Sequence, residues 1–226
     1  MVVRSCVRQK IKTKVLVAIA GLVSWLIKYN TIHIGGQKMT TETVEKLLTF
    51  EEYLTYQDGT DNNYELISGK LELMNPPTVR HFLIAKFLEQ EFDHQVQNKN
   101  LNWLCFREAG IRTGWQKSRL PDLFIVDKNV AMELLDSSAV FQTTPLLIVE
   151  IVSPESIKRD YRYKRSEYAA LEVPEYWIVD PQSNKITILV LNEGLYEETV
   201  FGEDKRIISP TFIELELTAE AIFSVA

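Results

Sequence analysis

The sequence predicts one mixed α/β domain over residues 39 to 226, preceded by an N-terminal extension of residues 1 to 38. Residues 146–152 form an apolar run interrupted by a single glutamate, which is typical of a strand covered on both faces. Alternating apolar and polar residues predict a β-hairpin over 64–73, and apolar residues at helical spacing predict a long helix over 79–97. A length of 226 residues, with 46% hydrophobic and 25% charged residues, suits one globular domain.

The other elements are predicted by the same patterns in chain order. A short helix is expected over 47–56, and the Ser68-Gly69 turn separates the hairpin strands 64–67 and 70–73. Further strands are expected over 103–113, 122–126, 146–152, 175–180 and 185–191, with a second long helix over 156–171. We therefore expect a single mixed sheet with helices on both faces.

The extension has a composition unlike that of the rest of the chain. Residues 1–38 contain seven Lys or Arg and no acid, and residues 15–27 form an apolar run that is too short to cross a bilayer comfortably. That run resembles the central part of a signal peptide, but no A-x-A cleavage site follows it. We favour a translation start at Met39, which would make residues 1–38 a start-site artefact. A true signal peptide or membrane anchor is the alternative, and export would overturn the cytoplasmic location that we expect.

Charge and cysteine content limit the classes of function. The net charge is −6, but residues 39–226 hold 18 basic against 31 acidic residues, a net −13. A domain this acidic has no broad basic face for DNA, so any contact with nucleic acid must be local. Cys6 and Cys105 form no zinc motif or disulfide framework, and the three histidines lack metal-binding spacing. Oxygen ligands are therefore expected for any metal. The lack of a disulfide framework also suits a protein of a reducing compartment.

Two carboxylates stand out for their positions in predicted strands. Asp122 follows Pro121 at the start of one strand, and Glu150 interrupts the apolar strand 146–152. A buried carboxylate needs a hydrogen-bonded partner, a cation or a catalytic role. Two carboxylates from neighbouring strands suit Mg²⁺, and Glu65 is a candidate third ligand. The alternative is a structural ion pair between Glu150 and a basic residue such as Arg107 or Arg112.

An ordered series of motifs resembles one protein family. The series covers about Leu48 to Leu191 and resembles the Uma family of the PD-(D/E)XK restriction-endonuclease-like superfamily. Its motifs are Tyr64-Glu65-Leu66-Ile67-Ser68-Gly69-Lys70-Leu71, Pro76-Pro77 before Arg80-His81, Arg119-Leu120-Pro121-Asp122, Leu147-Ile148-Val149-Glu150-Ile151-Val152-Ser153-Pro154, Asp160 with Lys164, and Pro174-Glu175-Tyr176-Trp177-Ile178-Val179-Asp180-Pro181.

The resemblance implies a restriction-endonuclease-like mixed sheet flanked by helices, with a site at one edge that cleaves phosphodiester bonds with a divalent metal. Asp122 would be the aspartate of the PD motif and Glu150 the second acid, with the Ile151 carbonyl as an additional ligand to Mg²⁺, or to Mn²⁺ as its substitute. The sequence departs from the superfamily motif at Val152, where a lysine is usual. Lys164 on the next helix is the implied replacement, and Lys158 is its rival.

A basic stretch follows the second carboxylate. Residues 158–165 contain five basic residues and two tyrosines, which is unusual in an acidic domain. Lys158, Arg159, Arg162 and Arg165 are candidate contacts to a phosphate backbone, and tyrosine rings can stack on bases. The alternative is a solvated helix face steadied by an ion pair of Asp160 and Lys164.

Arg80 and His81 at the start of helix 79–97 are further candidate contacts to nucleic acid. A histidine at such a position is more often a helix cap or a packing residue.

The leading hypothesis is a magnesium-dependent endonuclease that acts on DNA rather than RNA. A catalytically inactive nucleic-acid-binding or regulatory domain is the first alternative, and a metal-dependent hydrolase of small phosphorylated molecules is the second. Cleavage across a duplex needs two sites, so we also expect a homodimer, and we expect no stable membrane association of residues 39–226. If Lys164 is catalytic, Lys164→Ala should leave folding and metal binding nearly intact while it lowers the cleavage rate.

Overall fold

The computed structural model describes residues 31–34, 37–40 and 46–226. The chain divides into two units, Met1–Lys46 and Leu47–Ala226. In the first unit, the antiparallel strands β1 (Thr31–Ile34) and β2 (Gln37–Thr40) form a hairpin. The signal-like run of residues 15–27 lies outside the described residues. Among the helices that the structure describes, none is long and apolar enough to span a membrane.

The larger unit contains a six-stranded mixed sheet with the order β13-β12-β11-β10-β8-β5. As predicted, the apolar run forms an inner strand, β10, which pairs in parallel with β11 and antiparallel with β8. The other neighbouring strands are all antiparallel. The strands are β5 (Trp103–Phe106), β8 (Leu123–Asp127), β10 (Leu147–Ile151), β11 (Glu175–Asp180), β12 (Lys185–Asn192) and β13 (Leu195–Gly202).

A second, five-stranded sheet with the order β4-β3-β7-β6-β9 corrects the prediction of a single sheet. The predicted strand 103–113 is in fact β5 and β6, which belong to different sheets. The chain turns between them at Glu108, which has a positive φ of 58°. The strands of the second sheet are β3 (Tyr64–Ile67), β4 (Lys70–Leu73), β6 (Gly110–Gly114), β7 (Lys117–Arg119) and β9 (Val140–Phe141).

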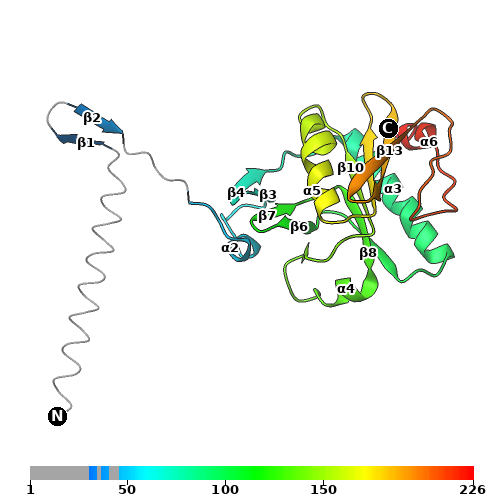
Figure 1. Ribbon diagram of the computed structural model, residues 1–226, viewed down its shortest axis with the longest axis horizontal. Helices are drawn as coiled ribbons and strands as arrows, with labels where there is room; N and C mark the ends of the chain where they lie inside the picture. Colours follow the sequence, from blue (N-terminus) through cyan, green and yellow to red (C-terminus); the bar gives the residue numbers. More distant parts are fainter. Residues whose placement is uncertain (1–30, 35–36, 41–45) are drawn as a thin grey trace, which may run out of the picture. The chain divides into compact units, whose positions relative to one another are not determined.

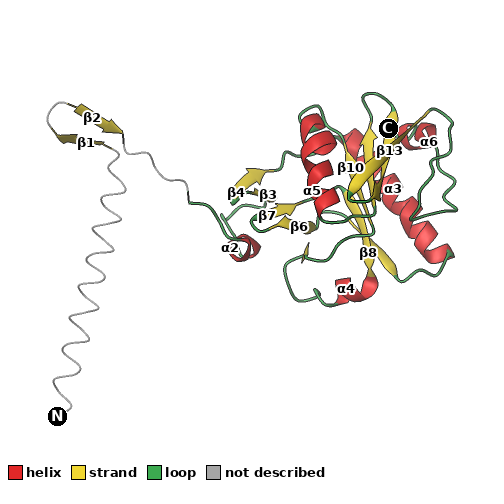
Figure 2. Ribbon diagram, in the orientation of Figure 1, coloured by secondary structure: helices red, strands yellow, loops and turns green. Residues whose placement is uncertain are grey.

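Helices cover both faces of the six-stranded sheet, as predicted (Figure 1). Helices α3 (Val79–Asn98) and α6 (Ala219–Phe223) contribute to the core on one face, around Trp177. Helix α5 (Arg165–Ala170) contributes to the core on the other face, together with residues of β6 and β9. Alternate residues of β10 enter the two cores, as expected for a strand with both faces buried. The short helices α2 (Phe50–Leu54) and α4 (Lys128–Met132) complete the fold (Figure 2).

The predicted helix over 156–171 is shorter and begins with a different geometry. A π-helical segment, η1 (Arg159–Lys164), leads directly into α5. Hydrophobic spacing predicted the helix but does not distinguish a π-helical turn from an α-helical one. π-Helical turns are rare in proteins, and many of those that occur lie at functional sites. The segment turns Asp160 and Lys164 inward, and both side chains are buried.

Candidate active site

The two carboxylates singled out in the sequence lie on the same side of the six-stranded sheet. In the antiparallel register of β8 and β10, Val149 lies opposite Leu123, so the next position brings Asp122 opposite Glu150. Glu150 faces the core that contains its strand neighbours Ile148 and Val152. The backbone N–H of Ile151 donates a hydrogen bond to Asp122 Oδ2 at 2.6 Å, which fixes the aspartate to the edge of β10. Adjacent strands thus bring the two acids together.

Glu150 is held on both carboxylate oxygens and is 3% exposed. The Tyr168 hydroxyl donates to Oε1 at 2.6 Å, and Lys164 Nζ lies 2.7 Å from Oε2. Burial raises the pKa of Glu150 to about 8; Lys164 opposes this rise, whereas the negative charges of Asp122 and Asp160 add to it. Glu150 thus pairs with a basic residue, as the alternative expected, but the partner is Lys164; Arg107 pairs with Glu89, and Arg112 bonds Gln142.

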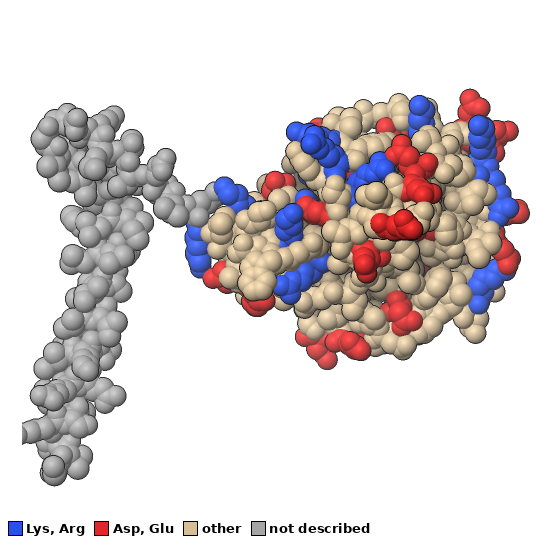
Figure 3. Space-filling model, in the orientation of Figure 1, with Lys and Arg blue, Asp and Glu red and all other residues tan. Residues whose placement is uncertain are grey.

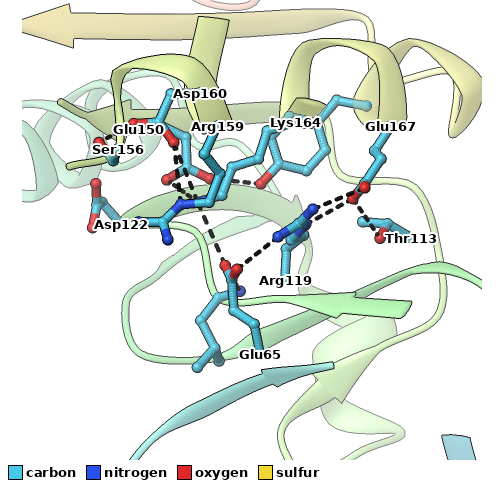
Figure 4. Close-up of polar contacts among 12 residues, drawn as sticks. Glu65, Thr113, Arg119, Asp122, Glu150, Ser156, Arg159, Asp160, Lys164 and Glu167 are labelled. Atoms are coloured by element: carbon cyan, nitrogen blue, oxygen red, sulfur yellow. Dashed lines mark hydrogen bonds and ion pairs between the residues drawn. The ribbon is translucent and has the colours of Figure 1, made fainter. Parts of the chain in front are cut away.

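Lys164 lies at the centre of a cluster of carboxylates (Figure 4). Its ammonium is 2.7 Å from Glu150, 3.5 Å from Glu65 and 3.6 Å from Asp160, and its side chain is 2% exposed. Burial alone would lower the pKa of Lys164, but these three carboxylates more than compensate and raise it. Its rival Lys158 is exposed, with Nζ 5.5 Å from the centre of the Tyr163 ring.

Arg119 connects the candidate site to the second sheet. Its guanidinium donates to Glu65 at 2.8 Å and to both oxygens of Glu167 at 2.7 and 2.8 Å (Figure 4). Glu65 also accepts the backbone N–H of Leu120 at 3.2 Å. Burial would raise the pKa of Glu65, but Lys164 and Arg119 lower it. Strand β7 ends at Arg119, so Leu120 and Pro121 alone separate this ion-pair network from Asp122.

His81 contacts the other oxygen of Asp122. Thr78 caps α3 by accepting the backbone N–H of His81, and this first turn places His81 Nε2 3.1 Å from Asp122 Oδ1. The two side chains are 17% and 22% exposed. His81 therefore lies beside the acidic site, whereas the sequence favoured a helix cap or a packing residue.

Asp122 and Glu150 supply carboxylate oxygens, the ligand type that a divalent cation such as Mg²⁺ takes, and each of these oxygens has a protein partner. Asp160 is buried; its Oδ1 accepts no hydrogen bond, but it lies 3.6 Å from Lys164 Nζ and 4.0 Å from Arg159 Nε. Among the described residues, no group of three or more His, Cys, Asp or Glu side chains is arranged to hold a metal. Two carboxylates with water and substrate phosphate are nevertheless a usual environment of Mg²⁺. Glu65 is occupied by basic partners, and its role as a ligand, like that of the Ile151 carbonyl, stays a prediction.

The predicted contacts to nucleic acid do not form one continuous basic surface. In the view of Figure 3, basic and acidic side chains are interspersed. Arg80 and Arg162 are exposed, like Lys158, and Arg159 is half-buried beside Asp160. Arg165 bonds Glu198 at 2.6 Å and the Tyr196 carbonyl at 3.1 Å, so its guanidinium is engaged by β13.

Three residues of the site were not among the candidates predicted from the sequence. Tyr168 binds Glu150, and Arg119 and Glu167 form the ion-pair network beside it. Arg119 stands in a motif named above, two residues before Pro121, which was the available indication. Tyr168 and Glu167 lie four and three residues after Lys164, so helical spacing could have placed Tyr168 on the same face as Lys164.

Comparisons with known proteins give a family for the chain and a solved structure with a similar fold. The model of the Uma2 family, described as "Putative restriction endonuclease", matches residues 50–220. A crystal structure of a putative nuclease belonging to DUF820 from Anabaena variabilis has a TM-score of 0.67 and 22% identity, covering 79% of this chain and 98% of that one. The type IIG restriction endonuclease BpuSI gives a TM-score of 0.35 and 14% identity over 65% of this chain and 15% of its own. The comparison with curated proteins gave no match. Because the family model matches most of the chain, the protein belongs to the Uma2 family of putative restriction endonucleases.

Proposed function

We propose that the protein is a magnesium-dependent endonuclease that hydrolyses phosphodiester bonds in DNA. The observation that carries the proposal is the convergence of Asp122, Glu150 and Lys164 from a strand start, a central strand and a helix. Asp122 and Glu150 would hold Mg²⁺, or Mn²⁺ in its place. When bound, the metal supplies a Lewis acid that stabilises charge on the phosphoryl oxygens and lowers the pKa of water.

The protein residues supply orientation and charge around that position. Lys164 carries the positive charge that can orient the attacking water and offset the negative charge that develops on the phosphate. Tyr168 and the Ile151 N–H fix the carboxylates of Glu150 and Asp122 by one hydrogen bond each. Hydrogen bonds that hold the carboxylates in place reduce the movement of these side chains that the reaction would otherwise require.

A homodimer is part of this proposal. A double-strand break requires two sites, and a two-fold dimer supplies them. β13 forms one edge of the six-stranded sheet, and its exposed residues Leu195 and Val200 are 74% and 51% accessible. An open edge of this kind can pair with the same edge of a second copy.

One observation favours a second candidate, a noncatalytic nucleic-acid-binding or regulatory domain. Both oxygens of Glu150 already have protein partners, Tyr168 and Lys164. If Lys164 serves permanently as the counter-ion of Glu150, the site needs no metal and performs no cleavage. The two candidates therefore differ in whether a divalent cation can share Glu150 with Lys164.

Incubation of supercoiled plasmid with Mg²⁺, Mn²⁺ or EDTA separates the candidates. We expect nicked and linear DNA with either metal, none with EDTA, and none for the Asp122→Asn variant. The Lys158→Ala variant, altered at an exposed position, is the matched control and should lose far less activity. Binding of DNA that persists in EDTA, without cleavage under any metal condition, would favour the regulatory domain.

A further inference from the structure

The side chain of Trp115 is exposed at the tip of the hairpin that joins β6 and β7. Its exposed fraction is 82%, and the described part of the chain contains no more exposed large hydrophobic residue. Trp177, by comparison, is fully buried in the core. The indole is a large apolar group, so its exposure to water is unfavourable. Isolated exposed apolar residues are nevertheless common on protein surfaces. Exposure alone therefore assigns no role, and the surroundings of the residue decide.

The backbone under Trp115 is firmly held. Arg112 donates to the carbonyls of Gly114 at 3.2 Å and Trp115 at 3.4 Å, and its guanidinium lies 4.0 Å from the centre of the Phe50 ring. Gly69, in the neighbouring β3–β4 turn, donates its N–H to the Gln116 carbonyl at 3.1 Å. The indole thus projects from a fixed turn, which lowers the entropy lost when a flat ligand stacks on it.

A hollow of about 310 Å³ adjoins the indole. Its volume lies at the lower end of the range for small-molecule sites. Its walls offer hydroxyl, amide and ammonium groups and no carboxylate, although acidic residues outnumber basic ones in the chain. The lining residues are Ser68, Thr113, Gly114, Trp115, Gln116 and Lys117. An aromatic platform beside a cation and neutral hydrogen-bonding groups matches a nucleotide, whose base stacks and whose phosphate is negative.

The hollow is joined to the candidate active site by one short strand. Lys117 and Arg119 both lie on β7 and both contact Glu167, at 3.3 Å from Lys117 and 2.7 Å from Arg119. Asp122 follows Trp115 by seven positions, so the two residues are separated by about 25 Å at most. At a rise of about 3.4 Å per nucleotide, a strand of roughly seven nucleotides spans this distance.

We propose that Trp115 binds the substrate strand by stacking on an unpaired base, with Lys117 next to the phosphate. This inference rests on the proposed function, because it names how the substrate of that site is held. It predicts that the protein prefers DNA with a single-stranded segment. The base lies in the hollow, and the strand continues from there toward Asp122, which is seven positions along the chain from Trp115.

Binding of a short fluorescein-labelled single strand, measured by anisotropy in EDTA and at low salt, tests the contact without cleavage. We expect Trp115→Ala to weaken binding by roughly 5- to 150-fold, the range for one stacked base, and Trp115→Phe to retain most of the affinity. Ile213→Ala is the matched control, because Ile213 is 79% exposed and lies far along the chain. Tryptophan emission of the wild type should fall on binding, and Trp115→Phe should lose this quenching.

Three results would overturn the inference: no binding of the single strand by the wild type, equal binding by wild type and Trp115→Ala, or an equal loss for single-stranded and fully paired DNA. A Trp115→Ala protein that loses self-association in light scattering, with unchanged affinity for the strand, would assign the indole to a second copy instead. Plasmid cleavage reports on the proposed function separately. If the wild type cleaves plasmid and Trp115→Ala binds the strand unchanged, only the stacking contact is refuted. If Trp115 is needed for strand binding but the wild type does not cleave, only the nuclease function is refuted.

Discussion

Replacement of Lys164 by alanine should affect both the stability and the chemistry of the protein. The lysine is buried, and its ammonium lies within 3.6 Å of the carboxylates of Glu150, Glu65 and Asp160. Removal of the ammonium leaves these groups without their shared counter-charge. The expectation from sequence that Lys164→Ala would leave folding nearly intact is therefore revised by the burial of the side chain.

The size of the effect follows from the burial of the cluster. Removing one partner of a buried ion pair costs about 3–5 kcal/mol, because the remaining charge is left unpaired. Burial raises the pKa of Glu150 and the loss of Lys164 raises it further, so that Glu150 can take up a proton in the variant, and Glu65 keeps Arg119; the loss should therefore stay within that range. For a domain of this length, the melting temperature should then fall by roughly 6–20 °C.

Thermal unfolding with and without Mg²⁺ measures the first effect, and plasmid cleavage by protein kept below its melting temperature measures the second. A divalent cation should stabilise Lys164→Ala more than the wild type, because it replaces the missing charge. Cleavage should fall by roughly 10²- to 10⁴-fold, the range for a group that orients or transfers a proton. Lys158→Ala is the matched control and should change stability by less than about 0.5 kcal/mol.

The double variant Lys164→Met with Glu150→Gln separates charge from packing. If the loss is electrostatic, the second change should restore part of the stability that Lys164→Met removes. An unchanged melting temperature for Lys164→Ala would refute the buried cluster. Normal cleavage by Lys164→Ala would refute its catalytic role, and a dead Lys158→Ala in that case would transfer the role to Lys158.

Four other predictions test the surrounding features. Millimolar Mg²⁺ or Mn²⁺ should raise the melting temperature of the wild type but not of Asp122→Asn, and a wild-type curve that ignores both metals would exclude the site. His81→Asn should weaken this metal-induced shift by freeing the aspartate, whereas His94→Asn, at an exposed position of the same helix, should not; equal shifts would leave the histidine contact without a role. Burial would raise the pKa of Glu167, but Arg119 lowers it, so its stabilising contribution exists above the pKa of the unfolded chain and is lost as pH falls through the folded pKa. Urea unfolding should accordingly show that Glu167→Gln costs roughly 1.5–3 kcal/mol at neutral pH and less in acid, and a pH-independent cost would contradict the ion pair. A chain that begins at Met39 should melt cooperatively and stay monodisperse, and aggregation cured only by the longer chain would make the extension part of the fold.

Elements with a strong local pattern could be predicted from the sequence. The central strand β10 was recognisable because both of its faces are buried, and α3 because one of its faces is. The separation of β5 from β6 was not predicted, although Arg107 and Glu108 interrupt the apolar pattern at the turn, because the two-sheet arrangement depends on distant contacts. The π-helical geometry of η1 was not predicted either, because the spacing of apolar residues indicates which helix face is buried but does not determine the number of residues per turn.

The candidate site was predictable where its chemistry is unusual in its local setting. A glutamate inside an apolar strand is exceptional, and Glu150 was found for that reason. Tyr168 is a common residue for a buried helix face, so nothing in its local setting distinguished a hydrogen-bond donor from a packing residue. Its contact with Glu150 depends on how α5 crosses the sheet, which only the three-dimensional structure provides.

The π-helical segment η1 makes chain length as important to the site as residue identity. Lys164 reaches Glu150 from fourteen positions along the chain, by way of a turn after β10 and the wide turns of η1. Losing or gaining one residue on this path would rotate the lysine around the helix axis by the step of one residue, about 100° in an α-helix, and point its ammonium away from the carboxylates. Exposed positions such as Arg162 can change their side chains without this effect. The length of the path from Glu150 to Lys164 therefore sets whether the lysine can reach the carboxylates at all.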